Sequence, residues 1–362
     1  MKVLLAPASF KGSYQAYQAA QLMASALTQI QPGWELVLCP MVDGGEGTRE
    51  AWSLWHKAET RTFQVPDWTG QVREVPFAWR ESREGSESGK IQTAAWIESA
   101  DVLGWHLSPE RKPMRATSFG LGVLLKHVLR LRPDQLYFGL GGTVSVDAGL
   151  GLLAGLGGGF WAQERAITCP AEWSHEARLK PCEFDSKETQ CIAVCDVNNA
   201  LLGPEGARVY MAQKGVAKQA EGQLEAIYQD MVQEMDPQQN RATRAGAGAA
   251  GGLGFALACL GFQLIPGSSF WAQITDLKTL IQECDLVISG EGQLDRQSWL
   301  GKPIGLLNGL CQELDKPLYA LCGQIQGVVP PGIRAVQMGG TAPYTDFLER
   351  VRSQFAAWFG AL

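Results

Sequence analysis

The sequence predicts an α/β protein with mainly parallel sheets. Short apolar runs of strand length alternate with longer stretches of helical periodicity, and several of the apolar runs end in loops rich in glycine and charged residues. This alternation is typical of parallel sheets, in which a helix crosses back between neighbouring strands. Ligands of such sheets bind at the carboxyl ends of the strands, so the residues that follow each strand are the first candidates for a functional site.

The first part of the chain is predicted to form a strand, a helix and a second strand. An apolar run covers residues 3–6 and stops at Pro7, and apolar residues then recur at helical spacing over residues 16–30. The Pro32-Gly33 pair ends the helix before a second β-rich run at residues 35–42. Together they predict a βαβ unit with parallel strands. Further strands are predicted at residues 136–140, 191–197, 286–289, 318–321 and 335–338.

The chain length predicts two domains, because 362 residues exceed the size at which one hydrophobic core usually continues to grow. The last predicted strands are suited to complete the sheet that begins at the N-terminus. We therefore expect a discontinuous Rossmann-like α/β domain of residues 1–65 and 280–362, and an inserted second α/β domain of residues 66–279. The polar stretch 81–90 is expected to be a surface turn.

Composition and charge exclude several classes of protein. A formal net charge of −6 gives no basic footprint, so nucleic acid is not an expected partner. Nine cysteines without a Cys-x-x-Cys pair indicate buried, reduced thiols, and with an N-terminal run too short for a signal peptide they predict a cytoplasmic protein. Residues 245–275 carry no charge, but their glycines and Pro266 favour a glycine loop and one buried helix over a membrane span. A membrane is therefore not an expected partner.

The loop after the first strand, residues 7–13, has the chemistry of an anion site. Lys11 offers a charge, Ser9 and Ser13 offer hydroxyls, and backbone amides are free at the start of the following helix. The alternative is an ordinary helix start, in which Ser13 is the N-cap and Lys11 is an exposed lysine. These residues alone do not decide between the two interpretations.

The loop after the second strand places two carboxylates among three glycines, in the segment Asp43-Gly44-Gly45-Glu46-Gly47-Thr48. Glycine lets the backbone approach a ligand closely, and Asp43 and Glu46 are suited to bind hydroxyls or a metal. A plain turn is the alternative interpretation. Carboxylates that flank glycines directly after a parallel strand favour the functional one.

A third loop, residues 139–149, is also rich in glycine and follows another predicted strand. The backbone amides of Gly141, Gly142 and Thr143 are suited to cradle phosphate oxygens, although no Gly-Lys-Ser/Thr of a Walker A sequence ends the loop. Glycine required for tight helix packing is the alternative, and both interpretations stay open.

Charged residues follow two more strands. Asp196 lies at the end of an apolar run, where its carboxylate is able to hold Mg²⁺ or accept a proton, whereas Lys214 taken alone is more typical of a surface lysine. Glu291 and Asp295 end another apolar run, and Lys302 follows them closely. Two carboxylates and a lysine at one strand end suit the handling of Mg²⁺ and phosphate.

The four histidines do not indicate a hydrolase or a zinc enzyme. No Gly-x-Ser-x-Gly segment and no His-Glu-x-x-His segment occurs in the chain. Surface or packing roles are expected for these histidines.

Taken in order, the loops resemble those of the type II glycerate kinase family, and the match in order and spacing covers nearly the whole chain. The segments that carry the resemblance are Ser9-Phe10-Lys11-Gly12-Ser13, Asp43-Gly44-Gly45-Glu46-Gly47-Thr48, Thr117-Ser118-Phe119-Gly120, Cys195-Asp196-Val197, Gln213-Lys214-Gly215, Gly246-Ala247-Gly248-Ala249-Ala250-Gly251-Gly252 and Gly290-Glu291-Gly292-Gln293-Leu294-Asp295.

The resemblance implies two α/β domains with the active site in the cleft between them, and phosphorylation of D-glycerate to phosphoglycerate, with 2-phosphoglycerate favoured. It implies ATP and Mg²⁺ as cofactors and leaves open whether the protein is a homodimer. It makes Lys11 and Lys214 phosphate or carboxylate binders. The same resemblance implies metal or hydroxyl contacts for Asp43, Glu46, Asp196 and Asp295. Of these, Asp196 and Asp295 are the metal candidates. Asp147, at a helix start, is a further candidate, as a base.

Three departures from the family pattern bear on activity. The family usually has an aspartate where this chain has Ala8 and an asparagine where it has Val146, and each change is expected to remove a polar group that faces the ligand. The segment 340–343 also differs from the family pattern. Two alternatives to an active glycerate kinase therefore stay open: an impaired relative that binds a small acid or nucleotide as a sensor, and a kinase for a related hydroxy acid.

Overall fold

The computed structural model describes residues 1–82, 91–299, 302–339 and 346–360. The chain divides into two compact units, of which unit 1 contains Met1–Asp43 and Ser268–Leu362, and unit 2 contains Gly44–Gly267. Unit 1 is thus discontinuous in sequence, with unit 2 inserted. The surface turn expected at residues 81–90 and the divergent segment 340–343 lie outside the described residues, except for Glu81 and Ser82, which end a strand.

The boundaries between the units differ from those expected at residues 65/66 and 279/280. Residues 44–65 belong to unit 2 because β3 (Glu59–Pro66) pairs antiparallel with β4 (Val72–Ser82) along its whole length. At the other boundary, α10 (Leu277–Glu283) packs against β1 (Lys2–Leu5) and therefore belongs to unit 1. Tertiary pairing, not the local pattern, sets both limits.

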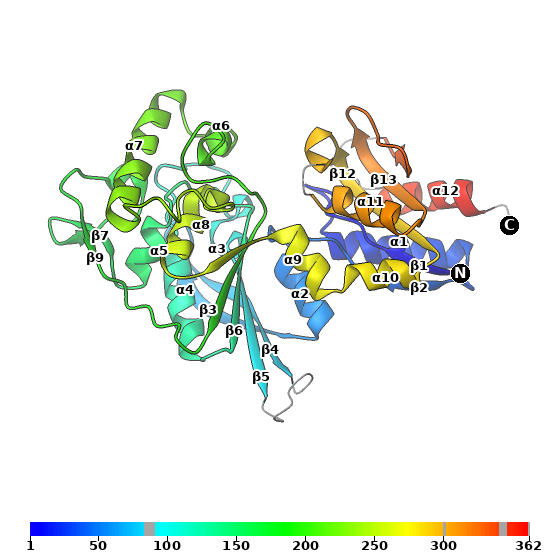
Figure 1. The fold of residues 1–362 in the computed structure, drawn as a ribbon, viewed down its shortest axis with the longest axis horizontal. Helices are drawn as coiled ribbons and strands as arrows, with labels where there is room; N and C mark the ends of the chain where they lie inside the picture. Colours follow the sequence, from blue (N-terminus) through cyan, green and yellow to red (C-terminus); the bar gives the residue numbers. More distant parts are fainter. Residues whose placement is uncertain (83–90, 300–301, 340–345, 361–362) are drawn as a thin grey trace. The chain divides into compact units, whose positions relative to one another are not determined.

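Unit 1 is built on a parallel sheet of five strands, in the order β14-β13-β12-β1-β2. Segments from the two ends of the chain lie side by side in it, because β1 pairs in parallel with β12; both strands are labelled in Figure 1. The strands besides β1 are β2 (Glu35–Leu38), β12 (Leu286–Leu294), β13 (Leu318–Ile325) and β14 (Ile333–Gln337). The described helices are α1 (Ala16–Ile30), α9 (Gly267–Ile274, which begins at the boundary), α10, η4 (Arg296–Trp299), α11 (Pro303–Glu313) and α12 (Phe347–Phe359).

The strand order places a topological switch point between β1 and β12. From β1 the chain proceeds to β2 on one side, whereas from β12 it proceeds to β13 and β14 on the other. Loops that leave neighbouring strands in opposite directions separate there, and ligands of open parallel sheets bind in the resulting crevice. The loops after β1 and β12 are therefore the expected ligand-binding loops of unit 1.

The core of unit 1 also anchors the loop after β1. Apolar residues of α1 recur at helical spacing and bury one face of the helix, including Ala19, Met23 and Leu27. Phe10, within the loop, is fully buried and packs edge to face against Phe347 of α12, with 4.7 Å between the ring centroids. The loop that carries Lys11 is thus fixed to the core at the residue before it.

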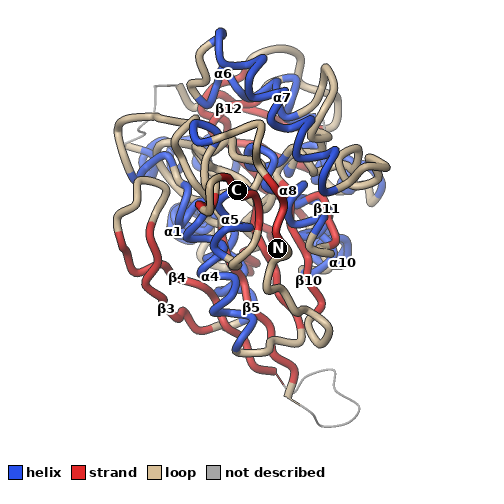
Figure 2. Tube along the Cα trace, turned by 90° about the vertical axis from the view of Figure 1, so that its left-hand side faces the viewer, coloured by secondary structure: helices blue, strands red, loops and turns tan. Residues whose placement is uncertain are grey.

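Unit 2 contains a mixed sheet of six strands in the order β11-β10-β6-β5-β4-β3, of which Figure 2 shows β3, β4 and β5 as neighbours. The strands β5, β6, β10 and β11 are parallel, and β3 and β4 extend the sheet in antiparallel fashion. The parallel strands are β5 (Gln92–Glu98), β6 (Gln135–Leu140), β10 (Gln190–Cys195) and β11 (Gln263–Pro266), and β7 (Gly159–Ala162), β8 (Arg165–Ala166) and β9 (Arg178–Lys180) form a separate small sheet.

Helices of unit 2 connect these strands, and two of them, α4 and α5, pack against each other. The described helices are α2 (Thr48–His56), α3 (Ala100–Leu103), η1 (Trp105–Leu107), α4 (Phe119–Arg130), α5 (Leu150–Gly155), η2 (Pro170–Glu172), η3 (Ala207–Tyr210), α6 (Met211–Lys214), α7 (Lys218–Met235) and α8 (Ala249–Cys259).

The uncharged stretch 245–275 forms more than the predicted loop and single helix. Helix α8 is buried almost throughout, as expected, but β11 and α9 follow it. Its first turn is left-handed at residues 250–252, where Gly251 lies so close to Ser145 that a Cβ atom would be 2.0 Å from the Ser145 carbonyl oxygen. In the described ranges, no helix has the length and apolar character needed to span a membrane. All nine cysteines are free thiols, as the sequence predicted.

Candidate active site

In unit 1, the predicted site residues other than Asp43 lie on the two loops at the switch point. The loop after β1 and the end of β12 are joined by backbone hydrogen bonds, from the Ala8 amide to the Gly290 carbonyl (2.7 Å) and from the Gly292 amide to the Ser9 carbonyl (3.4 Å). Lys11 is exposed. Its backbone lies close to Gly292, because a Cβ atom at residue 292 would be 3.2 Å from the Lys11 amide nitrogen. The helix that follows begins with Gln15 as its N-cap, not with Ser13, because the Gln15 amide bonds the Gln18 side chain (3.0 Å).

Glu291 is the buried carboxylate of this group. Its side chain is 8% exposed, and its Oε1 atom has no hydrogen-bond partner within the described ranges. Burial raises the pKa of Glu291 to about 7, whereas a hydrogen bond from the Ser298 side chain and the charges of Lys302 and Lys11 act to lower it, and the charge of Asp295 acts to raise it. A buried oxygen that lacks a donor and lies near two lysines is suited to accept a hydrogen bond from a ligand.

Asp295 is engaged in a local turn at the end of β12. Its Oδ1 atom accepts a hydrogen bond from the Ser298 amide (3.3 Å), and its Oδ2 atom accepts one from the Gln293 side chain (3.0 Å). In return, the Asp295 amide donates to the Ser298 hydroxyl (3.1 Å). These contacts start the short helix η4, so the structure gives Asp295 a role in the shape of this loop. Asp43 is the last residue of unit 1 and is half-buried after β2.

In unit 2, three predicted site segments meet at the carboxyl ends of β6 and β10. Asp196 lies over Gly141, where a Cβ atom would be 2.7 Å from the Asp196 Oδ2 atom and 2.7 Å from the Gly45 Cα atom. Glu46 lies beside Gly142, whose Cβ atom would be 3.4 Å from that of Glu46. Only glycine at residue 141 therefore leaves room for the Asp196 carboxylate and the loop 44–48 to lie against the end of β6.

Lys214 is buried in this group, although taken alone in the sequence it is more typical of a surface lysine. Its ammonium donates hydrogen bonds to the carbonyl oxygen of Thr143 and to the Thr143 hydroxyl (3.0 Å). Burial lowers the pKa of Lys214 to about 8, while the carboxylates of Asp196 and Asp147 act in the opposite direction. An ammonium has three N–H donors, so this geometry suits an anionic ligand as a further acceptor.

Asp147 lies near Lys214 but is enclosed by the protein. It is fully buried and accepts hydrogen bonds from the Ser118 amide (2.8 Å), the Ser118 hydroxyl (2.6 Å), the Gly149 amide (3.1 Å) and the Gly151 amide (3.2 Å). Burial raises the pKa of Asp147, and these four donors act to lower it. This geometry favours a structural role at the start of α5 over the role of base considered from the sequence.

The position of Val146 differs from the expectation that it faces a ligand. Its side chain is 1% exposed and belongs to a core cluster with Leu150, Phe160 and Tyr228. The apolar side chain at this position therefore contributes to packing in this chain. Ala8, the other departure, is half-buried at the end of β1, with its amide engaged by Gly290.

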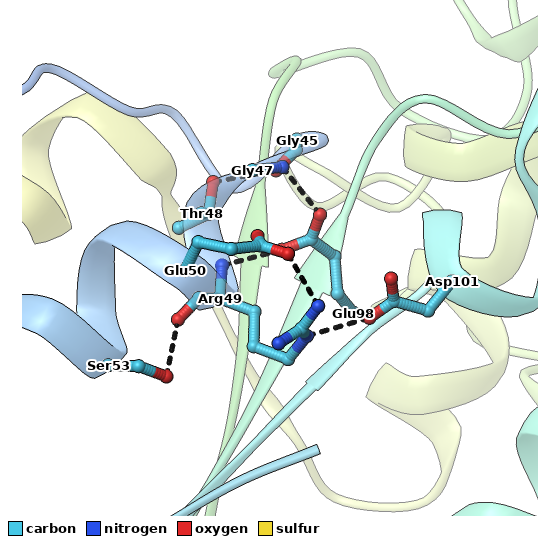
Figure 3. A network of polar contacts seen from close by, with 8 residues as sticks. All are labelled: Gly45, Gly47, Thr48, Arg49, Glu50, Ser53, Glu98 and Asp101. Carbon is cyan, nitrogen blue, oxygen red and sulfur yellow. Dashed lines mark hydrogen bonds and ion pairs between the residues drawn. The ribbon is translucent and has the colours of Figure 1, made fainter. Parts of the chain in front are cut away.

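Sequence reasoning missed Glu98, which fixes the loop that carries Glu46. At the carboxyl end of β5, the buried Glu98 carboxylate accepts hydrogen bonds from the amides of Gly47 (2.7 Å) and Arg49 (2.6 Å), at the start of α2 (Figure 3). The Arg49 guanidinium donates to Asp101 (2.8 Å) and to Glu50 (2.5 Å). The signal that singled out Asp196, a carboxylate directly after an apolar run, is also present at Glu98 and was available to find it.

Glu98→Gln is expected to lower the free energy of unfolding by about 1–3 kcal/mol, because the new amide NH₂ faces a backbone N–H and leaves it without an acceptor. Urea denaturation followed by circular dichroism measures this difference. Glu50→Gln is the matched control, since the Glu50 side chain is 36% exposed at the edge of the same network, and a change below about 1 kcal/mol is expected. Equal losses in the two variants would contradict a special role for Glu98.

Comparisons with known proteins find relatives that match nearly the whole chain. The Glycerate kinase family profile matches residues 3–353. The glycerate kinase of Neisseria meningitidis serogroup B is 32% identical over 345 residues, covering 91% of this chain and 87% of the relative. The glycerate 2-kinase of Escherichia coli K12 is 32% identical over 345 residues, covering 90% and 86%.

A solved structure extends the likeness to the fold. The crystal structure of a glycerate kinase 2 candidate from Salmonella typhimurium LT2 matches with a TM-score of 0.78 at 26% identity, covering 98% of this chain and 96% of that chain. The family match and these relatives each span most of the chain, across both units. The chain belongs to the glycerate kinase family.

Proposed function

We propose that this protein phosphorylates D-glycerate with ATP and that the product is 2-phosphoglycerate. Family membership supports the reaction class, and one observation in the structure carries the assignment to residues: the buried Lys214 ammonium, held on Thr143 and within the field of Asp196. A cation and a carboxylate together at the carboxyl edge of a parallel sheet match a small molecule that has both a carboxylate and hydroxyl groups.

Unit 2 supplies groups that suit the acceptor. D-glycerate has a carboxylate, which requires cations, next to two hydroxyls, which require acceptors. Lys214 offers the cation, and the carboxylates of Asp196 and Glu46 lie at the same strand ends. These carboxylates orient the reacting hydroxyl and receive its proton, while the amides after β6 are suited to oxygens that carry negative charge.

Unit 1 supplies groups that suit the nucleotide. Lys11 and Lys302 act on the same carboxylate, Glu291, at the switch point of the sheet, and two lysines at such a point suit phosphate oxygens. The buried Oε1 atom of Glu291 requires a hydrogen-bond donor, and the hydroxyls of the ribose provide one. The hydroxyls of Ser9 and Ser13 belong to the same loop.

Magnesium fits this donor set as a shared ligand of protein and nucleotide. In the described ranges, no three His, Cys, Asp or Glu side chains cluster as a metal-binding group, and the two candidates Asp196 and Asp295 belong to different units. Mg²⁺ is commonly held by one or two carboxylates together with substrate phosphates. A single carboxylate of the protein is therefore enough for a site of this kind. Asp196 lies at the carboxyl ends of β6 and β10 beside the groups that suit the acceptor, whereas Asp295 shapes a turn in unit 1, so Asp196 would hold the ion, which would neutralise charge on the phosphates.

In the reaction, the bond between the γ-phosphorus and the oxygen of the ADP leaving group breaks, and a bond forms from that phosphorus to the 2-hydroxyl oxygen of glycerate. The hydroxyl proton passes to a neighbouring carboxylate, for which Asp196 and Glu46 are the candidates. The transition state of such transfers is loose, so positioning and charge neutralisation supply most of the rate enhancement. Asp147 takes no part, because protein donors occupy both of its oxygens.

A coupled ADP-release assay with ATP, Mg²⁺ and D-glycerate, run beside L-glycerate, glycolate and lactate, tests the proposal. Turnover is expected with D-glycerate, and NMR of the product is expected to show 2-phosphoglycerate. Turnover with another acid alone would instead make the protein a kinase for a related hydroxy acid. If folded protein binds ATP but turns over none of these acids, the protein is a binding protein and the proposal fails.

A further inference from the structure

We propose that Arg111 is a specificity-determining residue that binds the carboxylate of the acceptor in unit 2. The inference rests on the proposed function and adds a residue that lies outside the loops described above. It is carried by the packing of Arg111 on an aromatic ring, by the backbone contacts that place this ring, and by the absence of a carboxylate partner for Arg111 in the described ranges.

The Trp105 ring brings Arg111 and Lys214 together. The Arg111 guanidinium carbon lies 4.3 Å from the centroid of the Trp105 ring, and the Lys214 ammonium lies 5.8 Å from the same ring. Arg111 is also close to the residue after Lys214, because a Cβ atom at Gly215 would be 3.8 Å from the Arg111 Cβ atom. Both distances to the ring are within the range of cation–π attraction, so one aromatic side chain holds two cations at the site.

Backbone contacts place Trp105 beside the loop after β6. Gly104 and Thr143 form an antiparallel bridge, and the Val144 amide donates a hydrogen bond to the Leu103 carbonyl (2.9 Å). Thr143 is the residue that binds the Lys214 ammonium. The segment that carries Trp105 is therefore fixed alongside Thr143, which holds Lys214. Arg111 is exposed and lies over the Trp105 ring.

The charge of Arg111 is not neutralised by the protein in the described ranges. No Asp or Glu of that part of the chain forms an ion pair with it, and its sequence neighbour Glu110 instead pairs with Lys112 at 2.5 Å. Burial lowers the pKa of Lys214 to about 8. Arg111 supplies a second positive charge close to that of Lys214, on the same aromatic ring.

The guanidinium of Arg111 lies over the Trp105 ring and keeps hydrogen-bond donors for a ligand. A guanidinium carries its five N–H groups along the edges of one plane. Such an edge binds a carboxylate through two parallel hydrogen bonds. With Asp196 and Glu46 at the same strand ends, the acceptor's carboxylate lies toward the cations and its hydroxyls toward the acids.

Arg111→Met tests this inference, because methionine keeps an apolar stem against Trp105 and removes only the charge and the donors. We expect the KM for D-glycerate to rise by about 10- to 100-fold, which is the cost of one charge-assisted contact, with kcat and the KM for ATP nearly unchanged. Isothermal titration of D-glycerate without nucleotide is expected to show the same loss of affinity. Lys112→Met, which removes the neighbouring exposed charge already paired with Glu110, is the matched control and is expected to behave as the wild type.

The outcomes separate this inference from the proposed function. Wild-type protein without glycerate kinase activity would refute the proposed function and, with it, this inference. Active wild type together with an unchanged KM for glycerate in Arg111→Met would overturn the inference alone. A rise in the KM for ATP in place of that for glycerate would assign Arg111 to phosphate and also overturn it, as would an equal rise in Lys112→Met.

Discussion

Replacing Lys214 with methionine is expected to reduce kcat/KM for D-glycerate by at least about 100-fold, the cost of leaving the substrate's carboxylate without its buried cationic partner. The ammonium is held by both oxygens of Thr143 and lies in the field of Asp196, so its position is set before any ligand binds. Methionine fills a similar volume without the charge. The coupled ADP-release assay measures the loss.

The fold is expected to survive this change. The Thr143 carbonyl loses its donor, which costs about 1–3 kcal/mol, but the burial of a charge is also relieved. Lys218→Met is the matched control, because Lys218 is an exposed lysine nearby that pairs with Glu221 at 2.9 Å. Wild-type activity in Lys214→Met, or an equal loss in Lys218→Met, would remove Lys214 from the site.

The difference in stability between the wild type and Lys214→Met, measured as a function of pH, provides a second check on the same residue. The pKa of Lys214 is lowered from 10.5 in the unfolded chain to about 8 in the folded protein. Between these values the unfolded chain binds the proton and the folded chain does not, so the stability of the wild type relative to Lys214→Met rises with pH across that window, by about 3 kcal/mol in total. The kcat/KM of the wild type is expected to fall as the pH rises above about 8, because Lys214 of the free enzyme loses its proton and with it its positive charge.

Lys11→Ala is expected to reduce kcat/KM by at least about 100-fold while the free energy of unfolding changes by less than about 0.5 kcal/mol. Lys11 is exposed, so its side chain contributes little to the core, whereas Phe10 beside it is fully buried and keeps the loop in place. Under the proposed division of binding between the units, the KM for ATP rises in this variant, in contrast to the rise in the KM for D-glycerate expected of Arg111→Met.

Steady-state kinetics with ATP as the varied substrate measure this effect, and urea denaturation measures the stability. Lys278→Ala is the matched control in unit 1, because Lys278 is also exposed and forms an ion pair with Glu313 at 2.6 Å. Near-normal kinetics in Lys11→Ala would place the phosphate contacts elsewhere. A large loss of stability would instead show that the aliphatic stem of Lys11 supports the loop.

The sequence alone determined the fold class, most of the parallel strands and the loops that follow them. The runs at residues 3–5, 136–140 and 286–288 are mainly apolar because parallel strands are buried on both faces, so their signal is local and strong. The glycines and carboxylates of the following loops are likewise visible in the sequence. The antiparallel strand β4 was missed, because Pro76 and several charged residues interrupt its alternation of buried and exposed side chains.

Only the tertiary structure decided which of these residues are buried and what they contact. Lys214 has no local feature that indicates burial, and its environment comes from Thr143, 71 residues away. Glu98 accepts a hydrogen bond from the amide of Gly47, 51 residues away in the sequence, and Asp147 accepts one from the Ser118 hydroxyl, 29 residues away. Burial, pKa shifts and hydrogen-bond partners depend on segments distant in the sequence, whereas periodicity and propensity describe only neighbours along the chain. For that reason the sequence located the loops, and the structure showed which of their residues are buried and which hold the loops in place.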